Sequence, residues 1–256
     1  MTWIQALILG CIEGVTEFLP ISSTAHLILI SHVMHIVQTD FMKSFEIIIQ
    51  LGAILAVVAL YWKQLLNVEI LKRLIVAFIP TGVLGVVFYH VVKKYLMDND
   101  AVILGALFFG GLFLILFEKW HTEKSDALND IATISYKKCL AIGVFQSIAM
   151  IPGVSRSAAT IIGGLVMGFK RETIVKFSFL LAMPTMVAAT GLDLVKNVSS
   201  FSASQSHVLA IGFITAFITA ILGIKFFLVY IQKHSFASFG VYRMIIAIVF
   251  FILFFV

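Results

Sequence analysis

Residues Val208–Ile231 read VLAIGFITAFITAILGIKFFLVYI, an apolar stretch that contains a single charged residue, Lys225. A helix of this length would cover the roughly 30 Å hydrocarbon core of a lipid bilayer. Other apolar stretches of similar length are Phe45–Trp62, Leu74–Val92, Ala101–Phe117, Ile174–Val195 and Val241–Val256. The pattern predicts an all-α, polytopic membrane protein whose partner is the lipid bilayer.

The composition agrees with this fold class and argues against a soluble protein. Hydrophobic residues make up 61% of the 256 residues and charged residues only 12%, about half of what a soluble domain carries. A net charge of +5 would suggest nucleic acid in a soluble protein, but these basic residues lie mostly in short loops between apolar stretches. We therefore expect no nucleic-acid partner. Cys11 and Cys139 lie far apart in apolar surroundings, without the spacing of a metal site, and are expected to be packing residues.

The chain is predicted to be one membrane domain built from two similar halves. The most polar segment, within 119–138, would be the loop that connects a first repeat, 1–118, to a second, 139–256. Near the start of each half, a shift of 133 positions matches five residues without a gap. It places Gly10 on Gly143, Glu13 on Gln146, Ser22 on Ser155, Thr24 on Ser157 and Ala25 on Ala158. With a slightly different shift, TGVLG at 81–85 matches TAILG at 219–223. Two matches in the same order indicate an internal duplication.

The basic residues predict how the two halves are oriented. Most of the 18 lysines and arginines lie in loops that would share the cytoplasmic side, and four lie on the other side, namely Lys43, Lys93, Lys94 and Lys196. Each half would contain three full spans, an odd number, so the second half is expected to be inverted relative to the first. Inverted repeats are common in transporters, which bind ligands near the middle of the membrane between broken helices.

The segments 2–30 and 139–168, which open the two halves, are the expected broken helices. Each is apolar but is interrupted by proline and serine, as LPISST at 19–24 and IPGVSRS at 151–157. Proline ends a helix at or before the preceding residue, and the hydroxyls that follow can cap a new helix. Non-helical backbone at that depth is tolerated only inside the protein or around a wet cavity. Each half should therefore contain a re-entrant helix pair, and the two tips should meet near the centre.

Glu13 and Glu17 are four residues apart, so on a helix they would share one face. Two carboxylates inside an apolar segment repel each other and lose hydration, and a divalent cation such as Mg²⁺ or Ca²⁺ would relieve both costs. The pattern therefore predicts a metal site at Glu13 and Glu17, and a pair at the water interface is the alternative. Glu46 and Gln50 repeat the spacing, and their role as metal ligands or as hydrogen-bonding residues is left open.

Arg156 lies inside a membrane segment, where a guanidinium costs several kcal/mol and indicates a functional site. Gly153 would permit a close backbone approach, a helix should begin near Ser157, and hydroxyls are supplied by Ser155, Ser157 and Thr160. A helix N-terminus beside a bidentate arginine is typical of a phosphate site. The alternative is a structural ion pair with a buried glutamate.

His26 follows Ser22, Ser23 and Thr24, and it could contact Ser23 if a helix begins there. Such a pair could act as nucleophile and base, or His26 could protonate a leaving oxygen. Taken alone, a histidine in an apolar run is more often a hydrogen-bonded core residue. These alternatives stay open from the sequence.

The strings EGVTEFLPISSTAH at 13–26 and PGVSRSAAT at 152–160 resemble the two signature motifs of the undecaprenyl-diphosphate phosphatases of the bacitracin-resistance type. Phe45–Gly52 and Phe177–Leu181 are also similar to segments of that family. Where the family usually has glycine, this chain has Ala25 and Ala158, which affects only the closest backbone approach.

The resemblance implies a hydrolase of the bacterial inner membrane that removes one phosphate from undecaprenyl diphosphate. It also implies re-entrant helix pairs, a site open toward the periplasm or cell exterior, dependence on a divalent cation, and recycling of the lipid carrier used in cell-wall synthesis. Transferred to this chain, the catalytic residues would be Glu17, Ser23, His26 and Arg156, and the metal ligands Glu13 and Glu17. The substrate-binding residues would be Ser22, Thr24, Gly153, Ser155, Arg156, Ser157 and Thr160.

Phosphoryl transfer needs positive charge around the phosphate and an aligned nucleophile. Arg156 and the backbone at Ser157 are expected to hold the diphosphate, and the attacking group would be Ser23, His26 or a metal-bound water, with Ser23 favoured. A transporter or flippase for a lipid phosphate is the alternative function, because it would share the inverted repeat and the buried polar residues. A homodimer is one further partner that the sequence leaves open.

Overall fold

Six long apolar helices dominate the described part of the computed structural model, which covers residues 1–37, 39–96, 99–123, 127–197 and 205–256. They are α3 (Asp40–Leu65), α4 (Val68–Val91), α5 (Asp100–Trp120), α8 (Arg171–Asn197), α9 (Ser206–Ile231) and α10 (Ala237–Phe255). Each is long and apolar enough to cross a bilayer. Within the described ranges the chain forms helices and no strand longer than an isolated bridge, so the prediction of an all-α membrane protein is confirmed.

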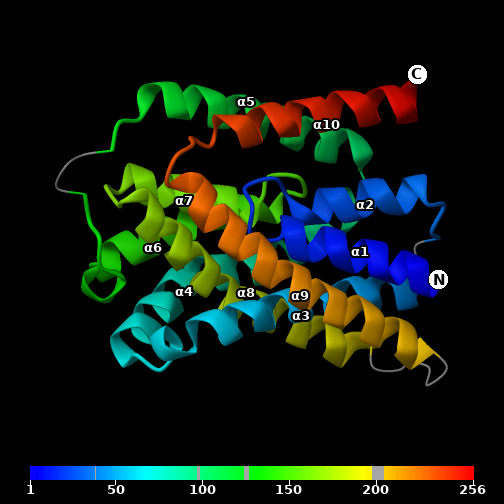
Figure 1. Ribbon diagram of the computed structural model, residues 1–256, viewed down its shortest axis with the longest axis horizontal. Helices are drawn as coiled ribbons and strands as arrows, with labels where there is room; N and C mark the ends of the chain where they lie inside the picture. Colours follow the sequence, from blue (N-terminus) through cyan, green and yellow to red (C-terminus); the bar gives the residue numbers. More distant parts are fainter. Residues whose placement is uncertain (38, 97–98, 124–126, 198–204) are drawn as a thin grey trace.

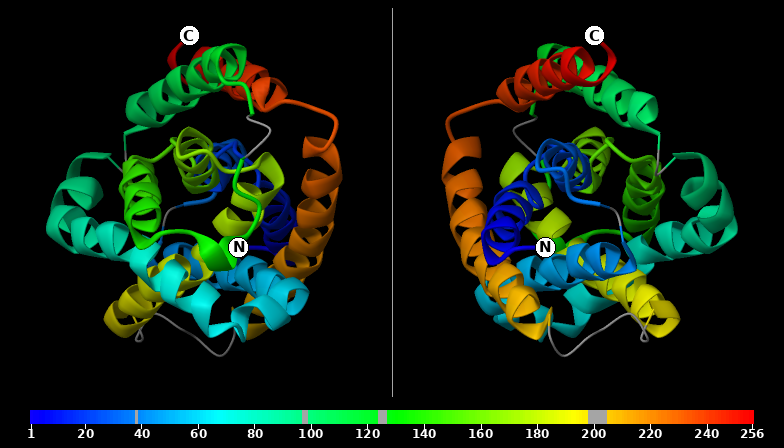
Figure 2. Two further views of the ribbon diagram at one scale, coloured as in Figure 1. Left: turned by 90° about the vertical axis from the view of Figure 1, so that its left-hand side faces the viewer. Right: turned by 90° about the vertical axis from the view of Figure 1, so that its right-hand side faces the viewer.

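Four shorter helices come in two pairs, and each pair precedes three of the long helices. The pairs are α1 (Trp3–Thr16) with α2 (Ser23–Val33), and α6 (Tyr136–Ser147) with α7 (Arg156–Val166). Viewed end-on, these short helices are enclosed by long ones (Figure 2). This order of helices is the one expected for two repeats. The inversion of one repeat relative to the other stays a prediction.

Helices of the first half pack mainly against helices of the second half. The first half's α1 packs against α9, α3 against α8 and α9, α4 against α6, and α5 against α10, each time across the halves (Figure 1). Glycines allow the closest of these contacts: a Cβ on Gly143 would lie 2.1 Å from the carbonyl oxygen of Ala77, and one on Gly14 would lie 2.4 Å from that of Ala216. Substitution at either position would therefore push two helices apart.

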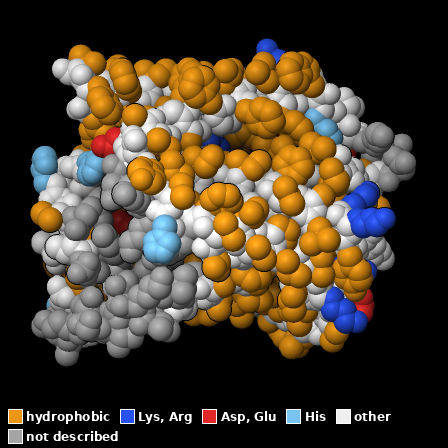
Figure 3. All heavy atoms as spheres, turned by 180° about the vertical axis from the view of Figure 1, so that it is seen from behind, with side chains coloured by type: hydrophobic (Ala, Val, Ile, Leu, Met, Phe, Trp, Pro, Cys, Tyr) orange, Lys and Arg blue, Asp and Glu red, His pale blue; other side chains and the backbone are white. Residues whose placement is uncertain are grey.

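The outer surface suits a lipid environment. Apolar side chains cover most of the middle of the face in Figure 3, and the Lys and Arg side chains in this view lie mainly toward one end. The lysine side chains that the sequence assigns to the external side, at 43, 93, 94 and 196, lie outside the described residues, as do residues 124–126 of the connecting loop. The orientation of the chain in the membrane thus stays a prediction.

Candidate active site

The site forms where both short pairs break. The α1 helix ends at Thr16 and is followed directly by Glu17, and α2 begins after Ser22, whose φ is +71°. In the second pair, α7 begins after Ser155, whose φ is +77°. Non-glycine residues rarely adopt a positive φ. The two serines that the shift of 133 positions superimposes therefore share an unusual backbone conformation, as a repeated turn would require.

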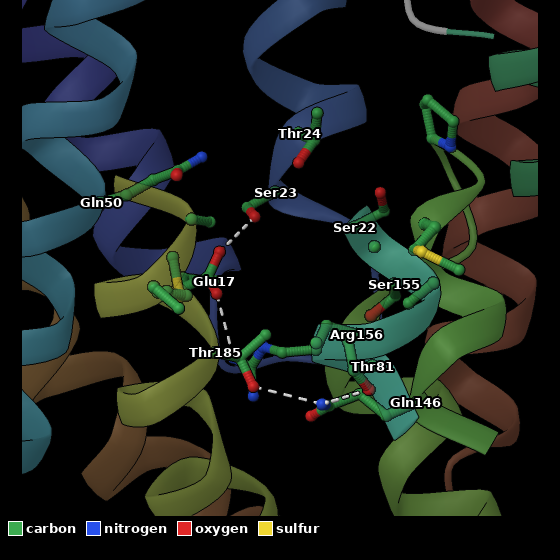
Figure 4. A pocket seen from close by; sticks show the side chains of 18 of the residues that line it. Glu17, Ser22, Ser23, Thr24, Gln50, Thr81, Gln146, Ser155, Arg156 and Thr185 are labelled. Carbon is green, nitrogen blue, oxygen red and sulfur yellow. Dashed lines mark hydrogen bonds and ion pairs between the residues drawn. The ribbon is translucent and has the colours of Figure 1, made fainter. Parts of the chain in front are cut away.

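The two turns bring an acid, a hydroxyl and an arginine together (Figure 4). Nη2 of Arg156 lies 2.9 Å from Oε1 of Glu17, although the residues are 139 positions apart. The hydroxyl of Ser23 donates a hydrogen bond to the other oxygen, Oε2, of the same carboxylate. Glu17 and Ser23 are buried, and the Arg156 side chain is 13% exposed. The sequence-predicted acidic and cationic turns therefore meet in one place.

Arg156 is held on its other side by the backbone. Its Nη1 donates to the carbonyl oxygen of Ser178, 2.8 Å away, and its guanidinium lies 6.0 Å from the ring centre of Phe18. Its buried Nε has no hydrogen-bond partner among the described residues. The guanidinium is thus fixed in orientation, and its Nε keeps a donor that no described residue uses.

A cavity of about 500 Å³ lies beside this group, within the usual range for small-molecule sites. Its polar wall contains Glu17, Ser23 and Arg156, together with other residues that the sequence also singled out, namely Ser22, Thr24, Gln50, Gly153 and Ser155. The remaining wall is largely apolar, with Phe78, Gly82, Gly85, Val86, Ala149, Met150, Met186, Ala188 and Ala189. A cavity of this kind suits a ligand with a polar head and an apolar tail.

A neutral polar cluster on the cavity wall was not expected. Nε2 of Gln146 donates to the hydroxyls of Thr81, at 2.9 Å, and Thr185, at 3.2 Å (Figure 4). Gln146 falls on Glu13 in the sequence repeat, and this was the only signal for it. Thr81 opens the repeated TGVLG segment, which does not by itself indicate a site, and Thr185 lies in an apolar stretch where nothing in the sequence marks it.

Two predicted substrate-binding residues lie behind the cavity wall. Ser157 is fully buried and donates to the carbonyl oxygen of Leu19 at 2.8 Å, which ties the second turn to the first. Thr160, also fully buried, donates to the carbonyl oxygen of Arg156 at 2.9 Å. In this arrangement both residues support the site through the backbone.

His26 is buried and holds the first turn. Its Nδ1 lies 2.8 Å from the carbonyl oxygen of Ser22, which can only accept, so Nδ1 carries the proton. In the neutral ring Nε2 then accepts from the hydroxyl of Tyr242, 2.9 Å away. Tyr242 lies on α10 and was not predicted from the sequence. Both ring nitrogens of His26 are thus engaged, and the Ser23 hydroxyl donates its hydrogen bond to Glu17. This arrangement favours Glu17 over His26 as the base that would take the proton of Ser23.

Glu13 lies one helical turn before Glu17 and is fully buried. Neither of its carboxylate oxygens has a hydrogen-bond partner among the described residues. Burying a carboxylate without a partner is costly, and a divalent cation or a shared proton would remove that cost. The carboxylate oxygens of Glu13 and Glu17 are therefore suitable ligands for a hard cation such as Mg²⁺ or Ca²⁺. No group of three metal-binding side chains gathers within the described ranges, so other ligands, such as phosphate oxygens or water, would complete its coordination.

Known proteins include relatives that match nearly the whole chain. A model of the family described as bacitracin resistance protein BacA matches residues 6–249. The chain belongs to the BacA family. Among its relatives, an undecaprenyl-diphosphatase of Aquifex aeolicus is 53% identical over 251 residues, which cover 98% of either chain. One of Sulfurihydrogenibium is 51% identical over 252 residues, 98% of this chain and 99% of the relative, and one of Methanococcus aeolicus is 41% identical over 250 residues, 97% of both.

Membership of the BacA family confirms the resemblance drawn from the two motifs. Both motifs, at 13–26 and 152–160, lie inside the matched range. They are also the segments that meet at the cavity, through Glu17 in the first and Arg156 in the second. The two motifs that carry the resemblance thus both contribute residues to the cavity wall.

Proposed function

We propose that this chain is a membrane hydrolase that converts undecaprenyl diphosphate to undecaprenyl phosphate and inorganic phosphate. The observation that carries the proposal is the contact between Glu17 and Arg156, beside the Ser23 hydroxyl, at the wall of a cavity that is otherwise largely apolar. The nearly full-length similarity to undecaprenyl-diphosphatases supports the substrate. An acid, a hydroxyl and an arginine at one point exceed what simple anion binding requires.

The geometry supports Ser23 as the nucleophile. Its hydroxyl proton passes to the Glu17 carboxylate as Oγ forms a bond to the terminal phosphorus. The bond from that phosphorus to the bridging oxygen breaks, and the lipid monophosphate leaves with the electron pair. A water molecule then cleaves the phosphoserine, which releases inorganic phosphate and restores the Ser23 hydroxyl. Arg156 stabilises the charge on the transferring group in both steps.

A divalent cation, Mg²⁺ or Ca²⁺, would be held by Glu13 and Glu17. It would supply positive charge against the phosphate oxygens. The described walls of the cavity carry one cation, Arg156, and one anion, Glu17, so they offer no net charge against a diphosphate. This balance and the unpartnered carboxylate of Glu13 support the cation requirement.

The apolar wall suits the polyprenyl tail. It includes Phe78 and Val86 on α4 and Ala188 and Ala189 on α8. Val86 is 74% exposed on the outer surface, where lipid would lie, so this wall connects the polar site with the bilayer. The tail would therefore leave the cavity along α4 while its diphosphate stays near Arg156.

The chain is a multi-pass membrane protein, and we place it in the bacterial inner membrane with the site facing the periplasm or cell exterior. The distribution of basic residues between the loops supports the orientation of the chain, and the resemblance to the family supports the side to which the site opens. Recycling of the lipid carrier for cell-wall synthesis and resistance to bacitracin would follow from such a placement, and the family's description supports the resistance.

Release of inorganic phosphate from undecaprenyl diphosphate by the purified protein in detergent tests the proposal. A detergent micelle does not separate two compartments, so release of phosphate there reports hydrolysis and not transport. We expect wild-type protein to release phosphate and Arg156→Ala to lose at least 100-fold in rate, as loss of a charge-stabilising donor does in other enzymes. Substrate binding without phosphate release by the wild type would instead support a lipid transporter.

A further inference from the structure

Arg243, on α10, makes an unusual set of contacts for a buried cation. The residue is 1% exposed and is the largest fully buried side chain among the described residues. Its guanidinium donates to four backbone carbonyl oxygens, those of Pro20 at 3.2 Å, Val154 at 3.0 Å, Gly153 at 2.9 Å and Ala106 at 3.0 Å. It has no ion pair within the described ranges.

Three of those carbonyls belong to the two turns of the site, and the fourth, that of Ala106, lies on α5. Pro20 lies three residues from Glu17 and from Ser23, whereas Gly153 and Val154 lie within three residues of Arg156. The peptide groups of such turns have no helical partner and must find donors elsewhere. One guanidinium, with donors in a fixed planar fork, satisfies carbonyls from the two turns at once.

The neighbouring helices leave room for this group through glycine. A Cβ on Gly110 of α5 would lie 2.2 Å from Nη2 of Arg243 and 3.0 Å from its Cζ. On the same two helices, a Cβ on Gly111 would lie 2.5 Å from the carbonyl oxygen of Gly240, and one on Gly240 would lie 2.5 Å from that of Gly111. The helices α5 and α10 are thus closely packed, and Gly110 opens the space that the guanidinium occupies.

We infer that Arg243 is a positioning residue that joins the two broken-helix turns and so holds Glu17 and Ser23 against Arg156. It does not line the cavity, and it is not part of the chemistry described above. Its effect passes through the backbone of 19–23 on one side and of 153–156 on the other. A displacement of reacting groups by about 1 Å can cost on the order of 100-fold in rate, so a loose turn should be visible in kcat.

The test uses phosphate release from undecaprenyl diphosphate by the full chain, so it rests on the proposed function. In Arg243→Lys the positive charge remains, but an ammonium cannot reach four carbonyls in one plane. We expect kcat to fall on the order of 100-fold. KM should change less than about 3-fold, because the cavity walls that bind the substrate remain. The apparent unfolding temperature in detergent shows whether the variant is folded.

Gly110→Ala provides an independent route to the same contact, because its methyl group would displace the guanidinium without changing Arg243. The matched control is Gly105→Ala on the same helix, where a Cβ would meet nothing within 4 Å. We expect Gly110→Ala to lower kcat and Gly105→Ala to leave it unchanged. In the double variant with Arg243→Lys, Gly110→Ala should add little, since residues that act through one contact are not additive.

The outcomes distinguish a failure of the proposed function from a failure of the inference about Arg243. If wild-type protein releases no phosphate, the proposed function fails and the kinetic test does not apply. If the wild type is active and both Arg243→Lys and Gly110→Ala keep kcat within about 2-fold, the turns do not depend on Arg243 and the inference is wrong. It is also wrong if the two substitutions lower kcat by independent factors that multiply in the double variant. Should Arg243→Lys fail to fold, Gly110→Ala against Gly105→Ala still decides.

Discussion

Glu17 and Arg156 form an ion pair of 2.9 Å that links the ends of two helices 139 positions apart in the sequence. These two residues are the only charged side chains on the described wall of the cavity. A diphosphate that enters must therefore compete with Glu17 for the guanidinium. The pair fixes the geometry of the two turns, and substrate binding would release the Glu17 carboxylate to act on Ser23.

The ion pair should stabilise the fold as a unit. Arg156→Gln leaves Glu17 buried without its cation, and breaking one side of a buried pair typically costs about 3–5 kcal/mol. We expect the double variant Arg156→Gln with Glu17→Gln to unfold at a higher temperature than Arg156→Gln alone. Thermal unfolding of the purified variants in one detergent measures this difference.

An exposed pair serves as the control for that experiment. Lys176 and Glu172 lie 2.6 Å apart, with side chains 38% and 51% exposed. Surface pairs contribute about 0–1 kcal/mol, so Lys176→Gln should shift the unfolding temperature little. Equal shifts for Lys176→Gln and Arg156→Gln would contradict a stabilising role for the buried pair.

Ser23→Ala tests the nucleophile. If the Ser23 oxygen attacks phosphorus, the variant should lose on the order of 1,000-fold or more in kcat, as nucleophile replacements do elsewhere. Acid-quenched wild-type enzyme should carry phosphate on Ser23, which mass spectrometry of its peptides would detect. Ser31→Ala is the control, since Ser31 is buried on the same helix and its hydroxyl has no described partner. A Ser23→Ala enzyme within 10-fold of wild type would point to water or His26 as the attacking group.

Tyr242→Phe removes the hydroxyl that donates to His26 and keeps the ring. The loss of one hydrogen bond to a buried acceptor costs about 1–3 kcal/mol, and His26 would hold the carbonyl of Ser22 less firmly. We expect a lower unfolding temperature and a kcat reduced several-fold, with KM nearly unchanged. Tyr230→Phe, which loses an exposed hydrogen bond to Ser238, should behave as wild type. Unchanged kcat and stability in Tyr242→Phe would show that His26 needs no partner on α10.

The sequence predicts the parts of this site that interrupt a pattern. Pro20 and Pro152 break apolar segments, Glu17 and Arg156 are charges where lipid is expected, and Ser22 and Ser155 are superimposed by the internal repeat. These features locate both turns and predict that they meet, and the structure adds the contacts by which they do so. The close packing of α1 on α9 depends on glycines whose effect is visible only once both helices are placed.

The sequence did not predict the supporting residues on the long helices, because no pattern relates them to the site. Thr81 and Thr185 are ordinary residues in apolar spans, and Tyr242 is near the start of the last span, where an aromatic residue is common. Arg243 follows it near the start of the same span, and the structure buries its side chain against backbone carbonyls. The argument applied to Arg156, that an arginine in an apolar span is costly, would have found it.

Removal of divalent cations tests the role of Glu13. We expect a chelator to suppress phosphate release and added Mg²⁺ or Ca²⁺ to restore it, because the cavity alone offers a diphosphate no net positive charge. Glu13→Gln should raise the cation concentration needed for half-maximal rate by at least about 10-fold, the loss typical of a changed metal environment. The cation should also raise the unfolding temperature of the wild type, since a ligand of the folded state stabilises it, and should do so less in Glu13→Gln.

Glu69→Gln, which changes a surface carboxylate paired with Lys72 and Arg73, is the matched control. Full activity in chelator, with no effect of the cation on unfolding, would mean that the buried Glu13 carboxyl carries a proton in place of a metal ion.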